Sequence, residues 1–115
     1  VMRREVDARR GDAAVVVTGD FNSTEDQPQY RTLTLGGDGA AGGPLADAYR
    51  AVHPAPGADE ASFHGFRGTT RGKRIDWILS SPELVAAAAT IDRTNKDGRY
   101  PSDHFAVTAD FAWKP

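Results

Sequence analysis

The stretch Ala13–Asn22, AAVVVTGDFN, joins an apolar run to a short polar motif. Residues 13–18 are small or β-branched, which predicts a short strand that is buried on both faces. Gly19 ends that strand, and Asp20 and Asn22 follow with one residue between them. Residues i and i+2 share a face of extended backbone, so both side chains could point into one cleft. The alternative is an Asx turn that only ends the strand.

Two more carboxylate motifs stand where an apolar run meets a loop. The first is Arg74-Ile75-Asp76-Trp77, and the second is Ser102-Asp103-His104, which precedes the alternating run of residues 105–113. Together with residues 19–22 they supply three carboxylates, one carboxamide and one imidazole. These groups suit a hard divalent cation and a phosphate arranged around a water molecule.

The partners of these carboxylates follow from their surroundings. An ionised Asp76 inside an apolar strand needs a partner, because burying an unpaired charge is costly. Arg74 is the poorer candidate and His104 the better one, since a carboxylate often fixes the tautomer of an imidazole. Asp103 and His104 are adjacent, so their side chains diverge on a strand. This favours a split role, with Asp103 on a metal ion and His104 facing the phosphate.

Other site types fit this sequence less well. Asp20, Asn22 and Thr24 begin like an EF-hand calcium loop, but Glu25 and Arg31 stand where that loop needs glycine and glutamate. The chain has no nucleophile-elbow, Walker or HExxH motif.

A histidine in a third apolar segment leaves two interpretations open. His64, in Ser62-Phe63-His64-Gly65-Phe66, either reaches the rim of the cleft and contacts substrate or packs as a strand residue.

The composition limits the classes of protein that the chain can represent. Its 115 residues match one small domain, and without cysteine it has no disulfide or thiolate metal site. A net charge of −2 does not indicate a nucleic-acid or membrane partner, and no apolar stretch approaches the roughly 18 residues that span a bilayer. Residues 1–5 lack the apolar core of a signal peptide. We expect a cytoplasmic or secreted bacterial protein and leave its compartment open.

The remaining pattern predicts a mixed, mostly β domain. Helices are expected over residues 2–10, 29–35 and 45–52, and strands over residues 62–66, 73–80 and 105–113. Residues 84–93 are ambiguous, because their alanines favour helix while Thr90 and Ile91 favour strand. Residues 36–43 are rich in glycine and predict a mobile surface loop. Asp97-Gly98 predicts the turn of a polar loop over residues 95–102.

The three motifs resemble signature blocks of the endonuclease/exonuclease/phosphatase superfamily, the group that contains DNase I. They occur in the same order and at similar spacing, and the resemblance runs over essentially the whole chain. Further segments resemble a bacterial subgroup of metal-dependent hydrolases, namely residues 30–33, 47–50, 63–66 and 92–94. The resemblance implies an α/β fold, the C-terminal half of a four-layer α/β sandwich with one mainly antiparallel sheet and flanking helices.

The resemblance also implies hydrolysis of a phosphoester by an activated water, with Mg²⁺ or Mn²⁺ as cofactor. By matched position, Asp20 would activate the water and help to bind the metal, and Asn22 would contact the phosphate of the substrate. Asp76 would support His104, which would bind or protonate the phosphoryl group. Asp103 would be a metal ligand.

One part of the family pattern has no counterpart in this sequence. The N-terminal half of such domains supplies the glutamate that is the principal metal ligand, so residues 1–115 are expected to be the C-terminal portion of a domain. We expect this portion alone to be inactive, to bind metal weakly, and to pack through an exposed sheet face on a second copy or another partner.

Two functional questions stay open at this point. A non-catalytic interaction module that retains the fold is the alternative to an enzyme. Among enzymes, a nuclease and a phosphoesterase of small molecules or lipids both fit. A cluster of basic residues consists of Arg67, Arg71, Lys73 and Arg74. It would either contact the backbone of a nucleic acid or belong to a solvated loop.

Overall fold

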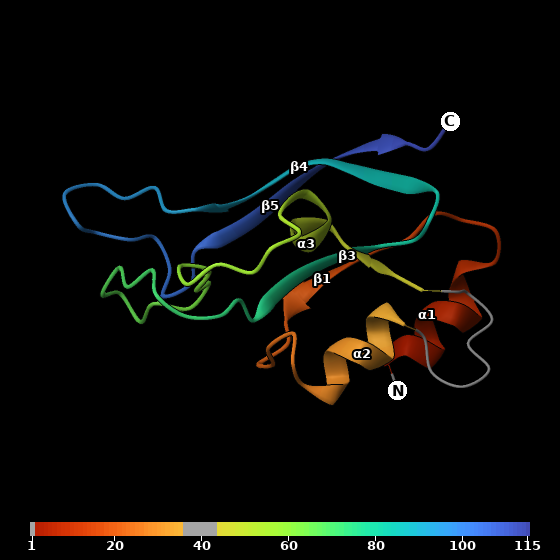
Figure 1. The fold of residues 1–115 in the computed structure, drawn as a ribbon, viewed down its shortest axis with the longest axis horizontal. Coiled ribbons are helices and arrows are strands. Elements are labelled where there is room, and N and C mark those ends of the chain that lie inside the picture. Colours follow the sequence, from red (N-terminus) through yellow and green to blue (C-terminus); the bar gives the residue numbers. More distant parts are fainter. Residues whose placement is uncertain (1, 36–43) are drawn as a thin grey trace.

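The computed structural model describes residues 2–35 and 44–115, so the loop predicted over residues 36–43 lies outside the described residues. The elements are, in order, α1 (Met2–Arg10), β1 (Val16–Asp20), α2 (Pro28–Thr34), β2 (Ala46–Asp47), α3 (Ala48–Val52), β3 (Asp76–Ser80), β4 (Leu84–Asp92) and β5 (Ala106–Trp113). Figure 1 shows the β4–β5 hairpin above a shorter sheet, with α1 and α2 below it. The predicted mixed α/β fold with antiparallel strands is confirmed.

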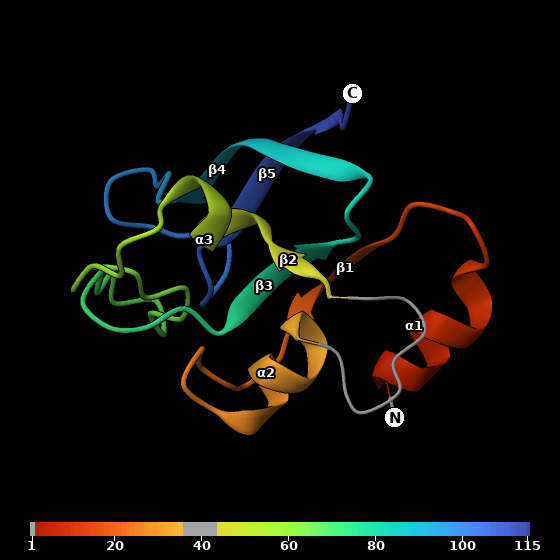
Figure 2. The ribbon, with the colours of Figure 1, turned by 45° about the vertical axis from the view of Figure 1, so that its right-hand side comes forward.

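β3 is the middle strand of the three-stranded sheet, with β1 on one side and β2 on the other. Both pairings are antiparallel, and Figure 2 shows the short β2 lying beside β3. On β3, Trp77 is 1% exposed and stacks on Phe21 with 4.5 Å between ring centroids. The Tyr30 ring meets Trp77 edge-on at 5.0 Å. Leucines complete this core, namely Leu33, Leu45 and Leu79.

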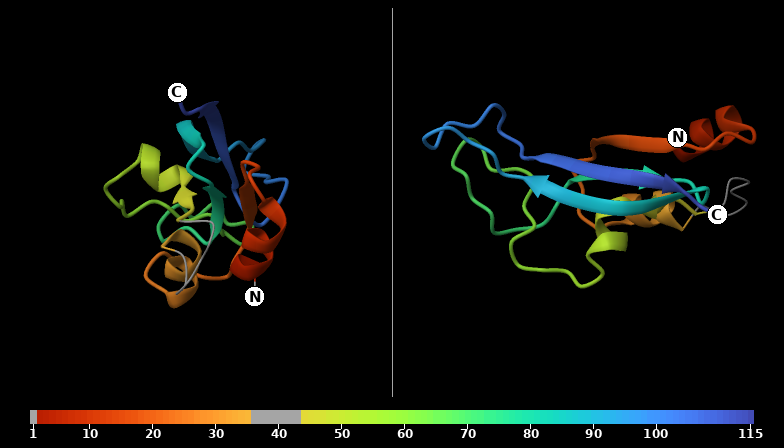
Figure 3. Two further views of the ribbon diagram at one scale, coloured as in Figure 1. Left: turned by 90° about the vertical axis from the view of Figure 1, so that its right-hand side faces the viewer. Right: turned by 90° about the horizontal axis from the view of Figure 1, so that it is seen from above.

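The β4–β5 hairpin forms the second sheet and extends along the molecule when seen from above (Figure 3). Residues 84–92 are a strand, so the ambiguity between helix and strand is resolved by cross-strand pairing. Thr90 lies opposite Thr108 with 2.7 Å between their hydroxyl oxygens, and Ile91 lies opposite Val107. Such β-branched pairs stabilise antiparallel ladders, and here they outweigh the helix propensity of the alanines.

The prediction that the first strand is buried on both faces was wrong. Within β1 only Val17 is partly buried, and Val16 is 46% exposed. β1 is an edge strand that pairs with β3 alone, and Thr18, Gly19 and Asp20 are exposed and line the pocket described below. Whether a second copy or another partner packs there stays a prediction.

The strand predicted over residues 62–66 was also wrong. Gly65 and Phe66 have φ values of +58° and +65°, and left-handed backbone turns the chain out of an extended path. What remains is one antiparallel bridge between Phe63 and His104.

Two other elements begin later in the sequence than predicted. The predicted strand 73–80 begins only at Asp76, because the Ser62 hydroxyl accepts the N–H groups of Ile75 and Asp76. The predicted helix 45–52 begins only at Ala48, because Asp47 is its N-cap and accepts the Tyr49 N–H at 3.1 Å.

The connection that leads into β5 has the predicted turn. Lys96 and Arg99 exchange backbone hydrogen bonds of 3.0 and 2.9 Å around Asp97 and Gly98, whose φ values are +53° and +76°. This is the left-handed pair that two-residue turns require. None of the helices in the described part of the chain is long and apolar enough to cross a membrane.

Candidate functional site

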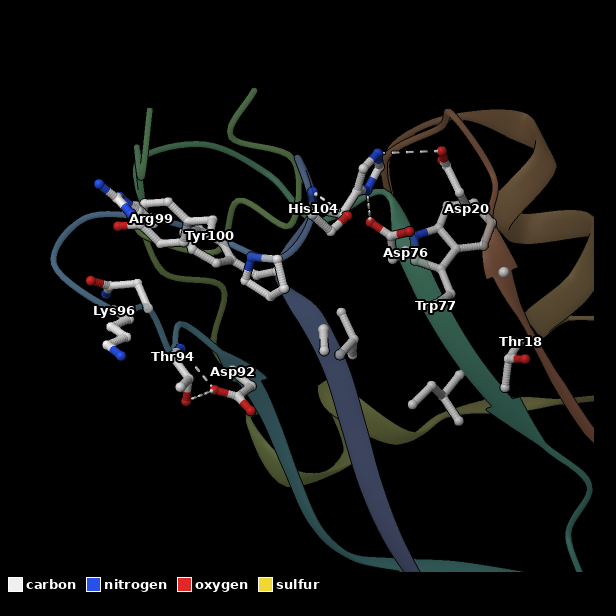
Figure 4. A pocket seen from close by; sticks show the side chains of 18 residues that line it. Thr18, Asp20, Asp76, Trp77, Asp92, Thr94, Lys96, Arg99, Tyr100 and His104 are labelled. Atoms are coloured by element: carbon white, nitrogen blue, oxygen red, sulfur yellow. Dashed lines mark hydrogen bonds and ion pairs between the residues drawn. The ribbon is translucent and has the colours of Figure 1, made fainter. Parts of the chain in front are cut away.

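Three predicted site residues meet at one edge of the three-stranded sheet. Asp20 ends β1 and Asp76 begins β3, and the antiparallel register places these two residues opposite each other. His104 comes from the segment before β5. One ligand atom from each of the three lies within 4.8 Å of the others, and Figure 4 shows their side chains converging. Residues from distant parts of the sequence therefore form one compact polar group.

The imidazole of His104 lies between the two carboxylates. Its Nδ1 is 2.8 Å from Asp76 Oδ2, and its Nε2 is 3.6 Å from Asp20 Oδ2. The predicted contact between Asp76 and His104 is thus confirmed. When Nδ1–H donates to Asp76, the ring orientation is fixed and Nε2 faces Asp20.

The electrostatics of this group favour the protonated imidazole. The pKa of His104 is raised above 6.5, first by its hydrogen bond to Asp76 and then by the charges of Asp76, Asp20 and Asp103. Partial burial acts in the opposite direction but does not cancel this effect. His104 therefore holds a proton more readily near neutral pH than an isolated histidine does.

The metal-binding capacity of the group can be assessed from its donor atoms. Asp76 Oδ2 and His104 Nδ1 bond each other, and Asp20 Oδ1 accepts the Asn22 N–H at 2.9 Å. Asp20 Oδ2 and Asp76 Oδ1 are left for an ion, and His104 Nε2 can join them only when the imidazole is neutral. Such a small set fits a divalent cation that keeps several of its waters, and does not fit one that needs a complete cage of protein ligands.

Asn22 does not lie where extended backbone would place it. Its φ is +48°, and its N–H bonds the carboxylate of Asp20, so these residues form an Asx turn. The alternation that would put both side chains on one face is absent, and Asn22 does not line the pocket described below. Contact between Asn22 and a phosphate stays a prediction.

Asp103 also lies outside the Asp20–Asp76–His104 group. Its carbonyl accepts the N–H groups of His64 and Gly65 at 2.9 and 3.1 Å. The structure thus gives the Asp103 backbone a part in holding the His104 segment, and a role for its carboxylate on a metal stays a prediction.

His64 is packed and does not reach the rim of the cleft. It is 4% exposed, and its ring lies 4.1 Å from Phe105 and 4.6 Å from Tyr100, measured between centroids. Neither ring nitrogen has a hydrogen-bond partner among the described residues. Of the two interpretations left open, the structure shows the packed one, so the expected substrate contact has no support in the geometry.

A pocket of about 1080 Å³ extends from this group toward the loop before β5. Its walls are largely apolar and include Ile78 and Val107. In Figure 4, Asp20, Asp76 and His104 lie at one end, and Lys96 and Arg99 lie at the other. The reactive groups therefore border a space large enough for a small organic molecule.

A second charged group, which the sequence did not reveal, is buried behind the site. Arg74 is 2% exposed, and its guanidinium bonds Asp47 at 2.5 Å and Glu25 at 2.7 Å. Arg50 bonds the same Glu25 and also Glu60, both at 2.7 Å. We call these residues the buried ion network. Because Arg74 belongs to it, the predicted basic surface cluster loses one of its members.

The buried ion network also contacts the start of β3. Arg74 Nη1 donates to the carbonyl of Asp76 at 3.1 Å, and the Tyr30 hydroxyl donates to Asp47 at 2.8 Å. Burial, together with the charge of Asp47, raises the pKa of Tyr30. The signal in the sequence was the pair of segments Tyr30–Leu33 and Asp47–Arg50, which stood out only through the family resemblance.

Comparison with known proteins agrees with this geometry. Residues 2–104 match the model of the Endonuclease/Exonuclease/phosphatase family. A search of the curated proteins finds no match.

Solved structures share the fold over nearly the whole chain. An endonuclease/exonuclease/phosphatase family protein from Bacteroides thetaiotaomicron has a TM-score of 0.77 at 23% identity, covering 99% of this chain and 43% of that one. The endonuclease/exonuclease/phosphatase from Bacteroides vulgatus has a TM-score of 0.75 at 27% identity, covering 98% and 41%. The mannosyl-6-phosphatase of Bacteroides thetaiotaomicron has a TM-score of 0.71 at 23% identity, covering 97% and 43%.

The chain thus spans about two fifths of the length of each of these solved structures. The family match covers residues 2–104, far more than half of the sequence. The chain belongs to the endonuclease/exonuclease/phosphatase family.

Proposed function

We propose that this chain contributes the acid and water-activating side of a metal-dependent phosphoesterase site. The observation that carries the proposal is the placement of the His104 imidazole, 2.8 Å from Asp76 on one side and 3.6 Å from Asp20 on the other. An imidazole held by a carboxylate, with its second nitrogen beside another carboxylate at the mouth of a pocket, is suited to moving protons during hydrolysis.

Each residue has a distinct part in this proposal. Asp76 holds the ring through Nδ1 and favours its protonated form, so that Nε2 can donate to a phosphoryl oxygen or to the leaving group. Asp20 has a side chain that is 39% exposed, so it can reach a water molecule and orient or deprotonate it. Asn22 would donate to a phosphoryl oxygen whose charge grows in the transition state.

The proposal includes Mg²⁺ or Mn²⁺, bound by Asp20 with help from Asp103. Such an ion supplies Lewis-acid stabilisation of the phosphoryl oxygens and lowers the pKa of a bound water. The donor atoms that remain around His104 support only part of a coordination shell. Since the chain spans about two fifths of the solved structures that it matches, we propose that further ligands are needed and that residues 1–115 alone are inactive.

For the substrate we propose a small phosphate ester rather than duplex nucleic acid. Burial of Arg74 in the ion network leaves fewer cations at the surface, and the net charge of −2 gives no long-range attraction to a polyanion. One solved relative of similar fold is a mannosyl-6-phosphatase, which is in line with a phosphate ester of this class.

The test is hydrolysis of p-nitrophenyl phosphate and of bis-p-nitrophenyl phosphate with Mn²⁺ by the protein in its full length, called the native protein from here on, and residues 1–115 alone should give none. Asp20→Ala and His104→Ala should each lower kcat by roughly 10²–10⁴-fold. Asp110→Ala is the matched control, because Asp110 is exposed on β5 and does not line the pocket.

Different results would separate the alternatives. Full activity in both site variants would overturn the residue assignment. Complete absence of hydrolysis by the folded native protein with all these esters and with DNA would favour the non-catalytic interaction module. Preferential cleavage of DNA would overturn the choice of a small ester.

A further inference from the structure

A buried serine links the two segments that carry Asp76 and His104. Ser62 is 0% exposed. Its hydroxyl oxygen accepts the N–H groups of Ile75 and Asp76 at 2.9 and 3.2 Å, and its carbonyl accepts the N–H of Phe105 at 2.7 Å. One residue therefore bonds the backbone at Asp76 and the backbone next to His104.

This link matters because the two segments belong to different sheets. Asp76 begins β3 of the three-stranded sheet, whereas His104 precedes β5 of the two-stranded sheet. Within residues 2–35 and 44–115, β3 and β5 do not pair. The segment that starts at Ser62 spans the gap, since Phe63 forms a bridge with His104 and the His64 N–H donates to the Asp103 carbonyl.

We propose that Ser62 is a positioning residue that sets the separation of the Asp76 carboxylate and the His104 imidazole. It does not line the pocket, so it acts through the backbone and not on the substrate. Without its hydroxyl, two partly buried N–H groups lose their acceptor and must move toward another one. That movement carries Asp76 away from the geometry in which its carboxylate accepts Nδ1–H of His104.

Ser81 provides a matched control at the opposite end of β3. It is also 0% exposed, and its hydroxyl oxygen also accepts a backbone N–H, that of Val15 at 2.8 Å. It lies just beyond Ser80, at the end of β3 opposite to Asp76. Ser62→Ala and Ser81→Ala therefore each remove a buried hydroxyl that accepts backbone N–H groups, near opposite ends of β3.

The first experiment follows the hydrogen bond itself. In the ¹⁵N-histidine-labelled protein, the downfield Nδ1–H resonance of His104 should be present in the native chain and in Ser81→Ala. It should be lost or shifted upfield in Ser62→Ala, and restored in Ser62→Thr, which keeps the hydroxyl. An unchanged resonance in folded Ser62→Ala would overturn the proposal.

The second experiment rests on the proposed function and uses the ester assay. A displacement of about 1 Å in a catalytic group can cost about 10²-fold in rate, so Ser62→Ala should lower kcat by that order with KM changed less than twofold. Ser81→Ala should lower the melting temperature to a similar extent with kcat kept. An equal loss of kcat in the two variants would mean that Ser62 stabilises the fold and does not position the site.

Two further results, a Ser62→Ala variant that does not fold and a native protein without activity, need separate treatment. If Ser62→Ala does not fold, Ser62→Cys replaces it, because a thiol has similar shape but accepts hydrogen bonds weakly. Native resonance and kcat in Ser62→Cys would overturn the proposal. A native protein that hydrolyses no ester would refute the proposed function, and the resonance experiment would still decide the role of Ser62.

Discussion

Arg74 and Asp76 are close neighbours in the sequence, but Arg74 belongs to the buried ion network and Asp76 to the Asp20–Asp76–His104 group at the pocket. In the buried ion network, Arg74 is 2% exposed and bonds two carboxylates, and Glu25 is shared by two arginines. In the Asp20–Asp76–His104 group, the side chains are 20–39% exposed, and two carboxylates share one imidazole. The first group joins two arginines to three carboxylates through bonds of 2.5–2.7 Å, whereas the second leaves its carboxylates and its imidazole at the wall of a pocket.

This difference shows how charged residues of the same types separate into two tasks. A charge buried with all its partners is fixed in place and holds elements together, because losing one partner leaves the others uncompensated. A group with spare acceptor atoms and solvent access can still bind a proton, an ion or a substrate. The carbonyl of Asp76 accepts from Arg74, so the buried ion network also supports the site.

The largest expected effect tests the structural side of the comparison. Arg74→Met should lower the free energy of unfolding by about 3–5 kcal/mol, because the side chain of Asp47, which is 2% exposed, would remain buried without its cation. Urea denaturation measures the change. Lys73→Met is the control, since Lys73 is 67% exposed in its side chain and pairs with an exposed Asp26. Equal losses in the two variants would contradict the distinction between the two groups.

The next effect tests the catalytic side. Asp76→Asn should lower kcat by roughly 10²–10⁴-fold, because the amide cannot stabilise a protonated His104. The free energy of unfolding should change far less than in Arg74→Met. Glu60→Gln should show the opposite pattern: its kcat per folded molecule should equal that of the native protein, and its unfolding midpoint in urea should be lower. If Asp76→Asn lost stability rather than activity, Asp76 would belong with the structural charges.

A smaller effect is expected in acid. The hydrogen bond from Arg50 holds the pKa of Glu60 below its usual 4.5, although burial opposes the shift. A lowered pKa stabilises the folded state above the unfolded value, and this contribution is lost as the pH falls through the folded pKa. As the pH is lowered past about 4.5, the urea concentration at the unfolding midpoint should therefore decrease. This decrease should be less steep in Glu60→Gln. Identical slopes for the two proteins would argue against this role of Glu60.

The smallest effect has the opposite sign and belongs to the site. The pKa of His104 is raised, mainly by its hydrogen bond to Asp76. Its contribution to stability is fully present below pH 6.5 and is lost as the pH rises through the folded pKa. His104→Gln should remove this slight decline toward alkaline pH. Histidine NMR titration checks the direction, and a His104 pKa below 6.5 would contradict it.

The contact between Asp76 and His104 was more predictable from the sequence than the residues that surround it. The Asp76–His104 contact was predictable, because a carboxylate in an apolar strand needs a partner and a nearby motif offered an imidazole. The partners of Arg74 were not predictable, since Asp47 lies 27 residues and Glu25 lies 49 residues away from it. Such pairs depend on how α3 and the loop before α2 pack against β3.

Local backbone explains the other errors. Alternation of residue types predicted a strand through Gly65 and Phe66, but pattern alone does not show that both adopt left-handed φ values. The same holds for Asn22, whose Asx turn replaces the expected extended geometry. The valines of β1 led to a wrong prediction of burial on both faces, because burial depends on the packing of other elements, which a single strand does not encode.

The pairing of Asp20 with Asp76 across β1 and β3 limits which insertions and deletions the sequence can tolerate during evolution. A shift of one residue in either strand would place Gly19 or Phe21 opposite Asp76 and turn the Asp20 side chain to the other face. Insertions and deletions inside these two strands are therefore expected to abolish activity even where a folded sheet survives. Length variation among relatives should accumulate in the connections and stop short of both strands.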